Sequence, residues 1–168
     1  MSTTIHESIL ALLDQHHVVY RTVHHEPTHT SEESAMARGE SVRIGGKALL
    51  IMTGDVFRLF VMSAALKLDN TALRHHFGTH RTRFATPEEL MKLTGLVPGS
   101  VPPFGRPILP FDLYLDESIP SNDRIAFNAG SLTDSVIMSV ADYLRIAQPA
   151  AVFRFTLPAA PNGPATPR

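Results

Sequence analysis

Hydrophobic side chains recur every three to four residues near the start of the chain. This spacing puts them on one face of a helix, so residues 5–15 are predicted to form an amphipathic helix. The residues on that face are Ile5, Ile9, Leu10, Leu12 and Leu13.

Capping residues delimit the other predicted helices. Thr86, Pro87 and Glu89 combine an N-cap, a proline at the first helical position and a capping box, and Gly95 marks the end of that helix. Three more helices are predicted: "SEESAMARG" after a cap at Thr30 or Ser31 and up to Gly39, residues 69–77, and "SVADYLRI" with Ser139 and Asp142.

Runs rich in β-branched and aromatic residues predict strands. "KALLIMTG" and "VFRLFVMS" flank Gly54-Asp55, which predicts a hairpin. The other expected strands are residues 18–25, 111–115, 124–128 and 134–138 and the stretch "AAVFRFT". Because strands outnumber helices without regular βα alternation, the fold class predicted is α+β, with a mixed, largely antiparallel sheet and peripheral helices.

Length and composition narrow the class of protein. The 168 residues suit one domain, predicted over residues 1–157, with a disordered proline-rich tail at 158–168. The absence of cysteine excludes disulfide and thiolate chemistry. No apolar run is long enough to span a bilayer and the first residues carry no basic leader, so a cytoplasmic protein is expected.

The charge of the chain is balanced but unevenly distributed. The formal net charge of −1 argues against a general polyanion binder. The segment "KLDNTALRHHFGTHRTR", residues 67–83, nevertheless carries Arg74, Arg81 and Arg83 with a single acid. Charge alone leaves two interpretations open: a face that meets a few phosphates, or a solvated helix and loop.

Two histidine-rich stretches are candidates for a metal site, and one serine is a candidate nucleophile. The sequence favours neither. "HHEPTH" and "HHFGTH" lack the helical spacing and the cysteine partners of a zinc site, so no metal is predicted. Ser100 lacks the G-x-S-x-G elbow of a nucleophilic serine.

Lys47 follows two glycines and opens an apolar strand. The stretch "RIGGKALLIM" does not have the spacing of a phosphate-binding loop. A lysine at the start of a buried strand either extends to solvent or points into a cleft to meet an anion. Both possibilities stay open on the sequence alone.

The stretch "LVPGSVPPFG", residues 96–105, is stiff and carries few polar side chains. Gly99 lets a ligand approach the backbone closely, while Pro102 and Pro103 restrict the far end of the loop. A stiff loop with free amides suits the binding of a carbonyl or an oxyanion. The alternative is a purely structural crossing loop.

Taken together, four stretches of the chain resemble the YbaK/ProX family of aminoacyl-tRNA editing proteins, relatives of the insertion domain of bacterial prolyl-tRNA synthetase. The resemblance runs from about Val18 to Phe155. The stretches, in order, are "VVYRTVHHEPTHTSEESA", "GGKALLIM", "LTGLVPGSVPPFG" and "FNAGSLTDSVIMSVADYLRI".

The resemblance implies a hydrolase that deacylates mischarged tRNA in trans, without metal, cofactor or covalent intermediate. Lys47, Gly99 and Pro103 match the family's catalytic positions, with the lysine near the terminal phosphates and the G-x-x-x-P loop at the substrate carbonyl. The substrate-binding positions implied are Tyr20, Thr30, Ala48, Ser100, Val101, Asn128, Gly130 and Ser135. Arg74, Arg81 and Arg83 are expected to add contacts to the tRNA acceptor end, and an aminoacyl-tRNA synthetase is a possible further partner.

Two positions depart from the branch that resembles an alanine-specific deacylase. That branch has asparagine after the lysine and histidine at the position of Asn128, whereas this chain has Ala48 and Asn128. Asn128 and Ser135 suit a hydroxylated side chain such as serine or threonine. Two other functions remain open: a non-catalytic module that binds tRNA or a synthetase, and a hydrolase of another small ester.

Overall fold

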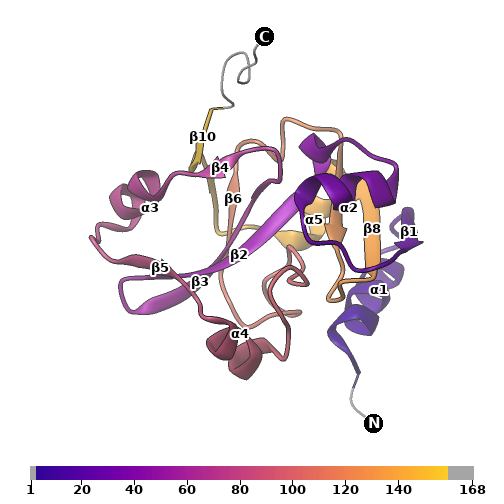
Figure 1. Cartoon of the computed structure of the whole chain (residues 1–168), viewed down its shortest axis with the longest axis horizontal. Helices are drawn as coiled ribbons and strands as arrows, with labels where there is room; N and C mark the ends of the chain where they lie inside the picture. Colours follow the sequence, from indigo (N-terminus) through magenta and orange to yellow (C-terminus); the bar gives the residue numbers. More distant parts are fainter. Residues whose placement is uncertain (1–2, 159–168) are drawn as a thin grey trace.

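The computed structural model describes residues 3–158, which form helices and strands in three sheets (Figure 1). The helices are α1 (Ile5–Gln15), α2 (Ser31–Arg38), α3 (Asn70–Phe77), α4 (Pro87–Thr94) and α5 (Val140–Ala147), with a 3-10 turn at Val42–Ile44. The strands are β1 (Tyr20–His24), β2 (Gly46–Thr53), β3 (Val56–Ser63), β4 (Lys67–Leu68), β5 (Thr82–Phe84), β6 (Leu113–Asp116), β7 (Arg124–Asn128), β8 (Asp134–Ser139), β9 (Ala151–Phe153) and β10 (Thr156–Leu157).

The largest sheet has five strands in the order β5-β2-β3-β6-β9. Its β5, β2 and β3 pair antiparallel, whereas β3 with β6 and β6 with β9 pair parallel. A three-stranded antiparallel sheet, β1-β8-β7, stands beside it, and β10 pairs with β4. The α+β class with a mixed, largely antiparallel sheet is therefore confirmed, although the strands divide into three sheets.

The two larger sheets meet at the start of β2. Gly45 forms a parallel bridge with Ala126 of β7. A Cβ atom on Gly46 would lie only 2.6 Å from Cδ1 of Ile125, so glycine is required for this close approach. The junction brings the beginning of β2 beside the end of β7.

Hydrophobic side chains fill both faces of the five-stranded sheet. The main core lies between this sheet and the three-stranded sheet and includes Phe127, Leu59 and the buried ring of Tyr143 from α5. A second cluster lies under α3, where Phe60 stacks on Tyr114 with ring centroids 5.5 Å apart. The five-stranded sheet is thus the central layer of the fold.

Most predicted boundaries match the structure. Thr86 and Glu89 form the predicted capping box of α4, Pro87 is its first residue, and Gly95 ends it with φ +75°. The hairpin of β2 and β3 turns at Gly54-Asp55 as predicted. These features depend on contacts within a few residues, which a local pattern can report.

The stretch "AAVFRFT" is the clearest difference, since it forms two strands instead of one. The chain breaks after Phe153 because the buried carboxylate of Asp116 accepts a hydrogen bond from the amide of Phe155 at 2.7 Å. It also accepts one from the hydroxyl of Thr156 at 3.0 Å. These contacts direct the chain from β9 into β10, which joins a different sheet.

Two short strands were not predicted from the sequence. The strand β4 lies at the start of the basic segment at residues 67–83, and β5 overlaps its end. From residue 159 onward, the predicted disordered tail lies outside the described residues. Among residues 3–158, no helix has both the length and the apolar character needed to cross a membrane.

Candidate active site

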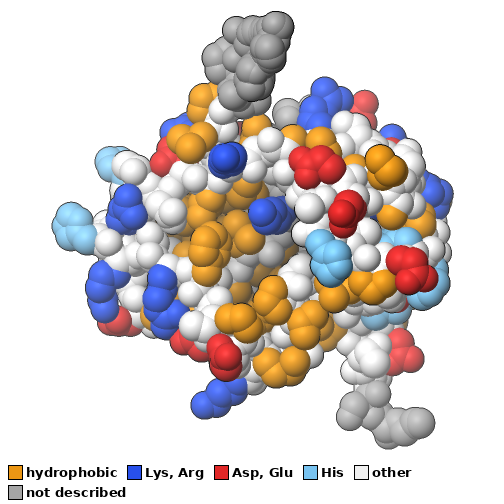
Figure 2. All heavy atoms as spheres, viewed as in Figure 1, with side chains coloured by type: hydrophobic (Ala, Val, Ile, Leu, Met, Phe, Trp, Pro, Cys, Tyr) orange, Lys and Arg blue, Asp and Glu red, His pale blue; other side chains and the backbone are white. Residues whose placement is uncertain are grey.

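A cavity of about 330 Å³ opens where α2, the start of β2, the end of β7 and the loop at residues 96–105 come together. On the face that presents β2, Figure 2 shows hydrophobic side chains gathered around a hollow near the middle of the molecule. The residues lining the cavity are Thr28, His29, Thr30, Ser31, Ser34, Arg38, Val42, Gly45, Gly46, Lys47, Ala48, Leu49, Ala64, Gly99, Val101 and Asn128.

Six of the site residues expected from the sequence line this cavity. They are Thr30, Lys47, Ala48, Gly99, Val101 and Asn128, which four separate segments of the chain contribute. Lys47 is exposed at the start of β2, and within residues 3–158 no carboxylate lies within 4.0 Å of its amine. Its charge is therefore available to an anion that enters the cavity.

Three contacts hold the loop at residues 96–105. Ser100 donates from its hydroxyl to the carbonyl of Val97 at 2.8 Å, which closes a turn. The side-chain amide of Asn128 donates to the carbonyl of Gly99 at 2.7 Å. The hydroxyl of Tyr143, whose pKa is raised by burial, donates to the carbonyl of Pro103 at 2.7 Å.

Two backbone amides of the loop are left without an acceptor inside the protein. Gly99 has φ +90°, in the left-handed region that favours glycine. Among residues 3–158, the amides of Gly99 and Val101 have no hydrogen-bond acceptor, and both residues line the cavity. Two fixed amides of this kind are suited to a carbonyl oxygen or an oxyanion.

Arg38 was missed by the sequence analysis, although it also lines the cavity. It is the last residue of α2 and only 8% exposed. Its Nε donates to Oγ of Ser135 at 2.9 Å and its Nη2 to Oδ1 of Asn128 at 3.0 Å. A basic residue in the last turn of a helix usually complements the helix dipole, so no local signal distinguishes it.

Ser135 and Asn128 belong to the same hydrogen-bond network as Arg38. Ser135 is fully buried and is not among the cavity-lining residues; its hydroxyl lies 3.2 Å from Oδ1 of Asn128 and 2.8 Å from Nε2 of His25. Nδ1 of His25 lies 2.9 Å from the carbonyl of Glu26, which can only accept. In the neutral ring Nδ1 is therefore the donor and Nε2 the acceptor.

Four other expected site residues lie outside the cavity lining. The hydroxyl of Tyr20 donates to Asp14 at 2.8 Å, and Ser100 is buried in the turn that it closes. Pro103 is buried and holds the loop through its contact with Tyr143. Gly130 packs against α1, where a Cβ atom would lie 2.9 Å from Cγ2 of Ile5.

The three arginines expected to contact tRNA lie near α3 and β5, away from the cavity. Figure 2 shows Lys and Arg side chains on this side of the molecule. Arg81 pairs with Asp55 at 2.9 Å, and Arg83 pairs with Glu89 at 2.8 Å. Arg74 makes long contacts with the hydroxyls of Thr71 and Thr82, at 3.3 and 3.4 Å.

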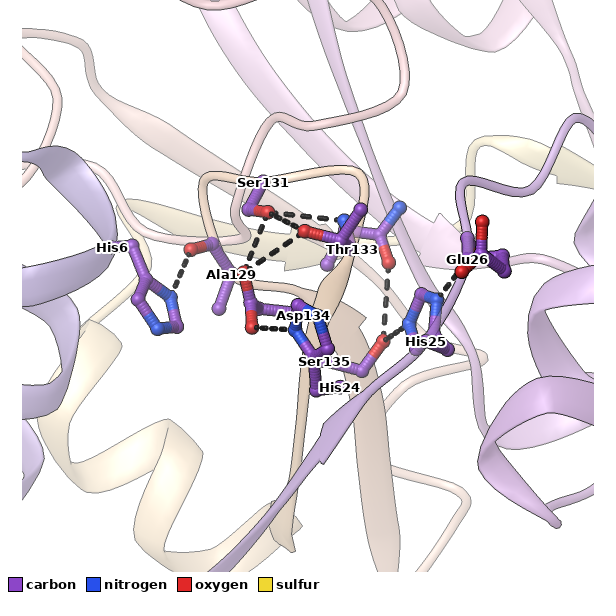
Figure 3. Close-up of polar contacts among 10 residues, drawn as sticks. His6, His24, His25, Glu26, Ala129, Ser131, Thr133, Asp134 and Ser135 are labelled. Atoms are coloured by element: carbon purple, nitrogen blue, oxygen red, sulfur yellow. Dashed lines mark hydrogen bonds and ion pairs between the residues drawn. The ribbon is translucent and has the colours of Figure 1, made fainter.

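Histidines from the N-terminal segment surround the turn between β7 and β8 (Figure 3). Nδ1 of His6 lies 2.8 Å from the carbonyl of Ala129, and Nδ1 of His24 lies 2.8 Å from Asp134. The bond to His24 holds the pKa of Asp134 below its ordinary value. Residues 3–158 contain no group of three His, Asp or Glu side chains placed to hold a metal.

Comparison with known proteins agrees with this geometry. Residues 25–146 match the aminoacyl-tRNA editing domain. The multifunctional Ser/Thr-tRNA deacylase ProXp-y of Escherichia coli (strain K12) is 40% identical over 159 residues, covering 90% of this chain and 93% of that protein. The prolyl-tRNA editing protein ProX of Acetoanaerobium sticklandii (strain ATCC 12662) is 25% identical over 145 residues, covering 83% of this chain and 88% of that protein.

A solved structure shares the fold as well. A crystal structure described as a candidate trans-editing enzyme for prolyl-tRNA synthetase superposes with a TM-score of 0.78 and 25% identity, covering 94% of this chain and 100% of that one. The segment that matches the editing-domain family, residues 25–146, includes every residue that lines the cavity, from Thr28 to Asn128. The resemblance carried by the four sequence stretches is therefore confirmed: the chain belongs to the family of aminoacyl-tRNA editing domains.

Proposed function

We propose that this chain is a trans-acting hydrolase that cleaves the ester between a wrong amino acid and the terminal adenosine of tRNA, with serine and threonine as the amino acids removed. The observation that carries the proposal is the placement of Lys47 and the free amides of Gly99 and Val101 around one cavity. Within the described residues, no Asp or Glu lines that cavity. A cavity with only basic ionisable side chains suits the end of an RNA strand.

The reaction requires few groups from the protein. The oxygen of a water molecule bonds to the ester carbonyl carbon, the bond from that carbon to the ribose oxygen breaks, and the ribose oxygen takes up a proton. The amides of Gly99 and Val101 are placed to donate to the carbonyl oxygen as it gains negative charge. As the family resemblance implies, a free hydroxyl of the substrate's own ribose activates the water.

Lys47 contributes charge to binding. Its exposed amine, with no carboxylate partner in residues 3–158, suits a phosphate near the end of the tRNA. The Escherichia coli relative is named for its action on Ser- and Thr-tRNA, which supports the same substrates here. The proposal places the reaction in the cytoplasm, at the acceptor end of tRNA released by a synthetase.

A deacylation panel tests the proposal. One tRNA is charged in turn with serine, threonine and alanine, and loss of each ester is followed with the wild-type protein and with Lys47→Ala. We expect rapid loss of the seryl and threonyl esters and a fall in kcat/KM of about 10- to 100-fold in Lys47→Ala, because a charged contact is lost. Lys92→Ala, which removes an exposed lysine of α4 outside the cavity, serves as the matched control. Stability of every ester at high protein concentration contradicts the proposal.

A second candidate function is hydrolysis of a small ester that carries no tRNA. One observation favours it: Arg81 and Arg83 are already paired with Asp55 and Glu89, so the basic segment is less available to phosphates than its sequence indicates. A small-ester hydrolase would use the same cavity and would not depend on those arginines.

A further inference from the structure

Arg38 is a buried cation without an acidic partner. Its side chain ends in the wall of the cavity, and among residues 3–158 no carboxylate lies within 4.0 Å of its guanidinium. Burial lowers the pKa of Arg38 to about 10, so the group stays charged at neutral pH. Burying a charge without a counter-ion is unfavourable unless its donors find acceptors.

Two of the three guanidinium nitrogens are used inside the protein. Nε donates to Ser135 and Nη2 donates to Asn128, which fixes the plane of the group. The third nitrogen, Nη1, has no hydrogen-bond acceptor among residues 3–158. A Cβ atom built on Gly45, which also lines the cavity, would lie 3.6 Å from Nη1. The unused donor is therefore at the cavity wall.

This arrangement changes the roles of Asn128 and Ser135. Oδ1 of Asn128 accepts from Arg38 and lies 3.2 Å from the hydroxyl of Ser135, and its Nδ2 donates to the carbonyl of Gly99. Ser135 is fully buried behind the lining. Both residues thus orient Arg38, and Nη1 is the guanidinium nitrogen that remains free to meet a ligand.

The required ligand atom follows from the chemistry of the guanidinium. Arg38 can donate but cannot accept, so Nη1 requires an oxygen acceptor. Asn128 bonds both to Arg38 and to the loop that carries the amides of Gly99 and Val101. A substrate carbonyl bound at those amides would therefore lie in the same cavity as the Arg38 donor. An aminoacyl group whose side chain carries an oxygen close to its α-carbon can meet both.

We propose that Nη1 of Arg38 donates to the side-chain hydroxyl oxygen of the aminoacyl group, and that Arg38 is the residue by which the site selects serine and threonine. The inference rests on the proposed deacylase function and assigns its specificity to one residue. An apolar side chain of the same shape would displace water from the cavity without accepting a hydrogen bond. The charged donor of Arg38 would then be left unpaired. Sites that donate a hydrogen bond to a substrate hydroxyl strongly reject analogues that lack it.

The test uses isosteric pairs of esters on one tRNA: serine against 2-aminobutyrate, and threonine against valine. With the full wild-type chain, we expect kcat/KM to favour the hydroxylated member of each pair by about 100-fold or more. In Arg38→Met, the preference should fall below about tenfold, mainly through loss of activity on the hydroxylated esters. Arg38→Lys, which keeps the charge with a different donor geometry, should retain part of the preference.

Arg43→Met is the matched control, since Arg43 is an exposed arginine close in sequence that does not line the cavity. It should leave both ratios unchanged. If Arg38→Met does not fold, the kcat/KM ratios of the wild type and of Arg38→Lys still test the inference. A further measurement on the wild type compares inhibition by 3′-amide analogues of seryl- and 2-aminobutyryl-adenosine.

The outcomes separate the inference from the function on which it rests. A wild-type protein that cleaves both members of each pair equally well overturns the role of Arg38 while leaving the deacylase activity intact. An unchanged ratio in a folded Arg38→Met, or an equal loss on all esters, also overturns it, because Arg38 then acts on the carbonyl or on folding. A wild-type protein that cleaves no ester contradicts the proposed function, and the inference falls with it.

Discussion

At the scale of single residues, buried polar groups organise this molecule from positions that look ordinary in the sequence. Arg38 connects α2 to β7 and β8 through residues 90 and 97 positions away. Asp116 is 1% exposed and accepts hydrogen bonds from the amides of Ser118 and Phe155 and from the hydroxyl of Thr156. Each of these side chains holds segments that are distant in sequence.

Replacing Asp116 tests this role at the residue scale. Asp116→Ala leaves three buried or half-buried donors without their acceptor, so we expect the free energy of unfolding to fall by about 3 kcal/mol or more. Urea denaturation measures the change. Asp112→Ala, which removes an exposed carboxylate paired with Arg106, is the control and should change stability by less than about 1 kcal/mol.

At the scale of elements, local signals account for most helices and for the central hairpin. Each helix from α1 to α5 has a Ser, Thr or Asp N-cap whose side chain accepts from a backbone amide of the first turn. In α4, Glu89 serves both the capping box and the ion pair with Arg83. These bonds lower the pKa of Glu89 to about 2, with the Arg83 contact as the largest cause.

The lowered pKa of Glu89 predicts how acid affects stability. A carboxylate whose pKa is lower in the folded state stabilises the protein above its ordinary value of 4.5, and this contribution is lost as pH falls from 4.5 to about 2. Wild-type protein should therefore be more stable than Glu89→Gln at pH 6, with the difference shrinking towards pH 2.5. Urea denaturation across this range measures it. Glu88→Gln, a neutralisation in the same helical turn, should show a flatter difference.

At the scale of the whole molecule, the cavity and the basic segment are the two surface features that we propose contact the tRNA substrate. The cavity lies at the junction of two sheets, and the basic segment lies beyond it along β2 and β5. Because Arg81 and Arg83 are paired on the surface, a phosphate must compete with Asp55 and Glu89 for them. The contribution of this face to tRNA binding is therefore expected to be moderate.

Charge reversal at Arg74, Arg81 and Arg83 separates tRNA substrates from small esters. For a tRNA deacylase, we expect kcat/KM on seryl-tRNA at low salt to fall about tenfold and its dependence on salt to weaken, because phosphate contacts are lost. Hydrolysis of a seryl ester of adenosine alone should be unchanged. If both substrates respond equally, the face acts on folding or on the cavity; if neither responds, it does not contact tRNA.

The amino-acid sequence by itself determined the helix caps, the hairpin at Gly54-Asp55, the α+β class and, through four ordered stretches, the editing family. These features depend on contacts between residues close in sequence or on short sequence motifs. Only the tertiary structure decided that Arg38 faces the cavity, that Gly130 packs against α1, and that two of the surface arginines are already paired. The physical reason is that a side chain's role depends on which distant groups desolvate it and satisfy its hydrogen bonds, and sequence spacing does not contain that information.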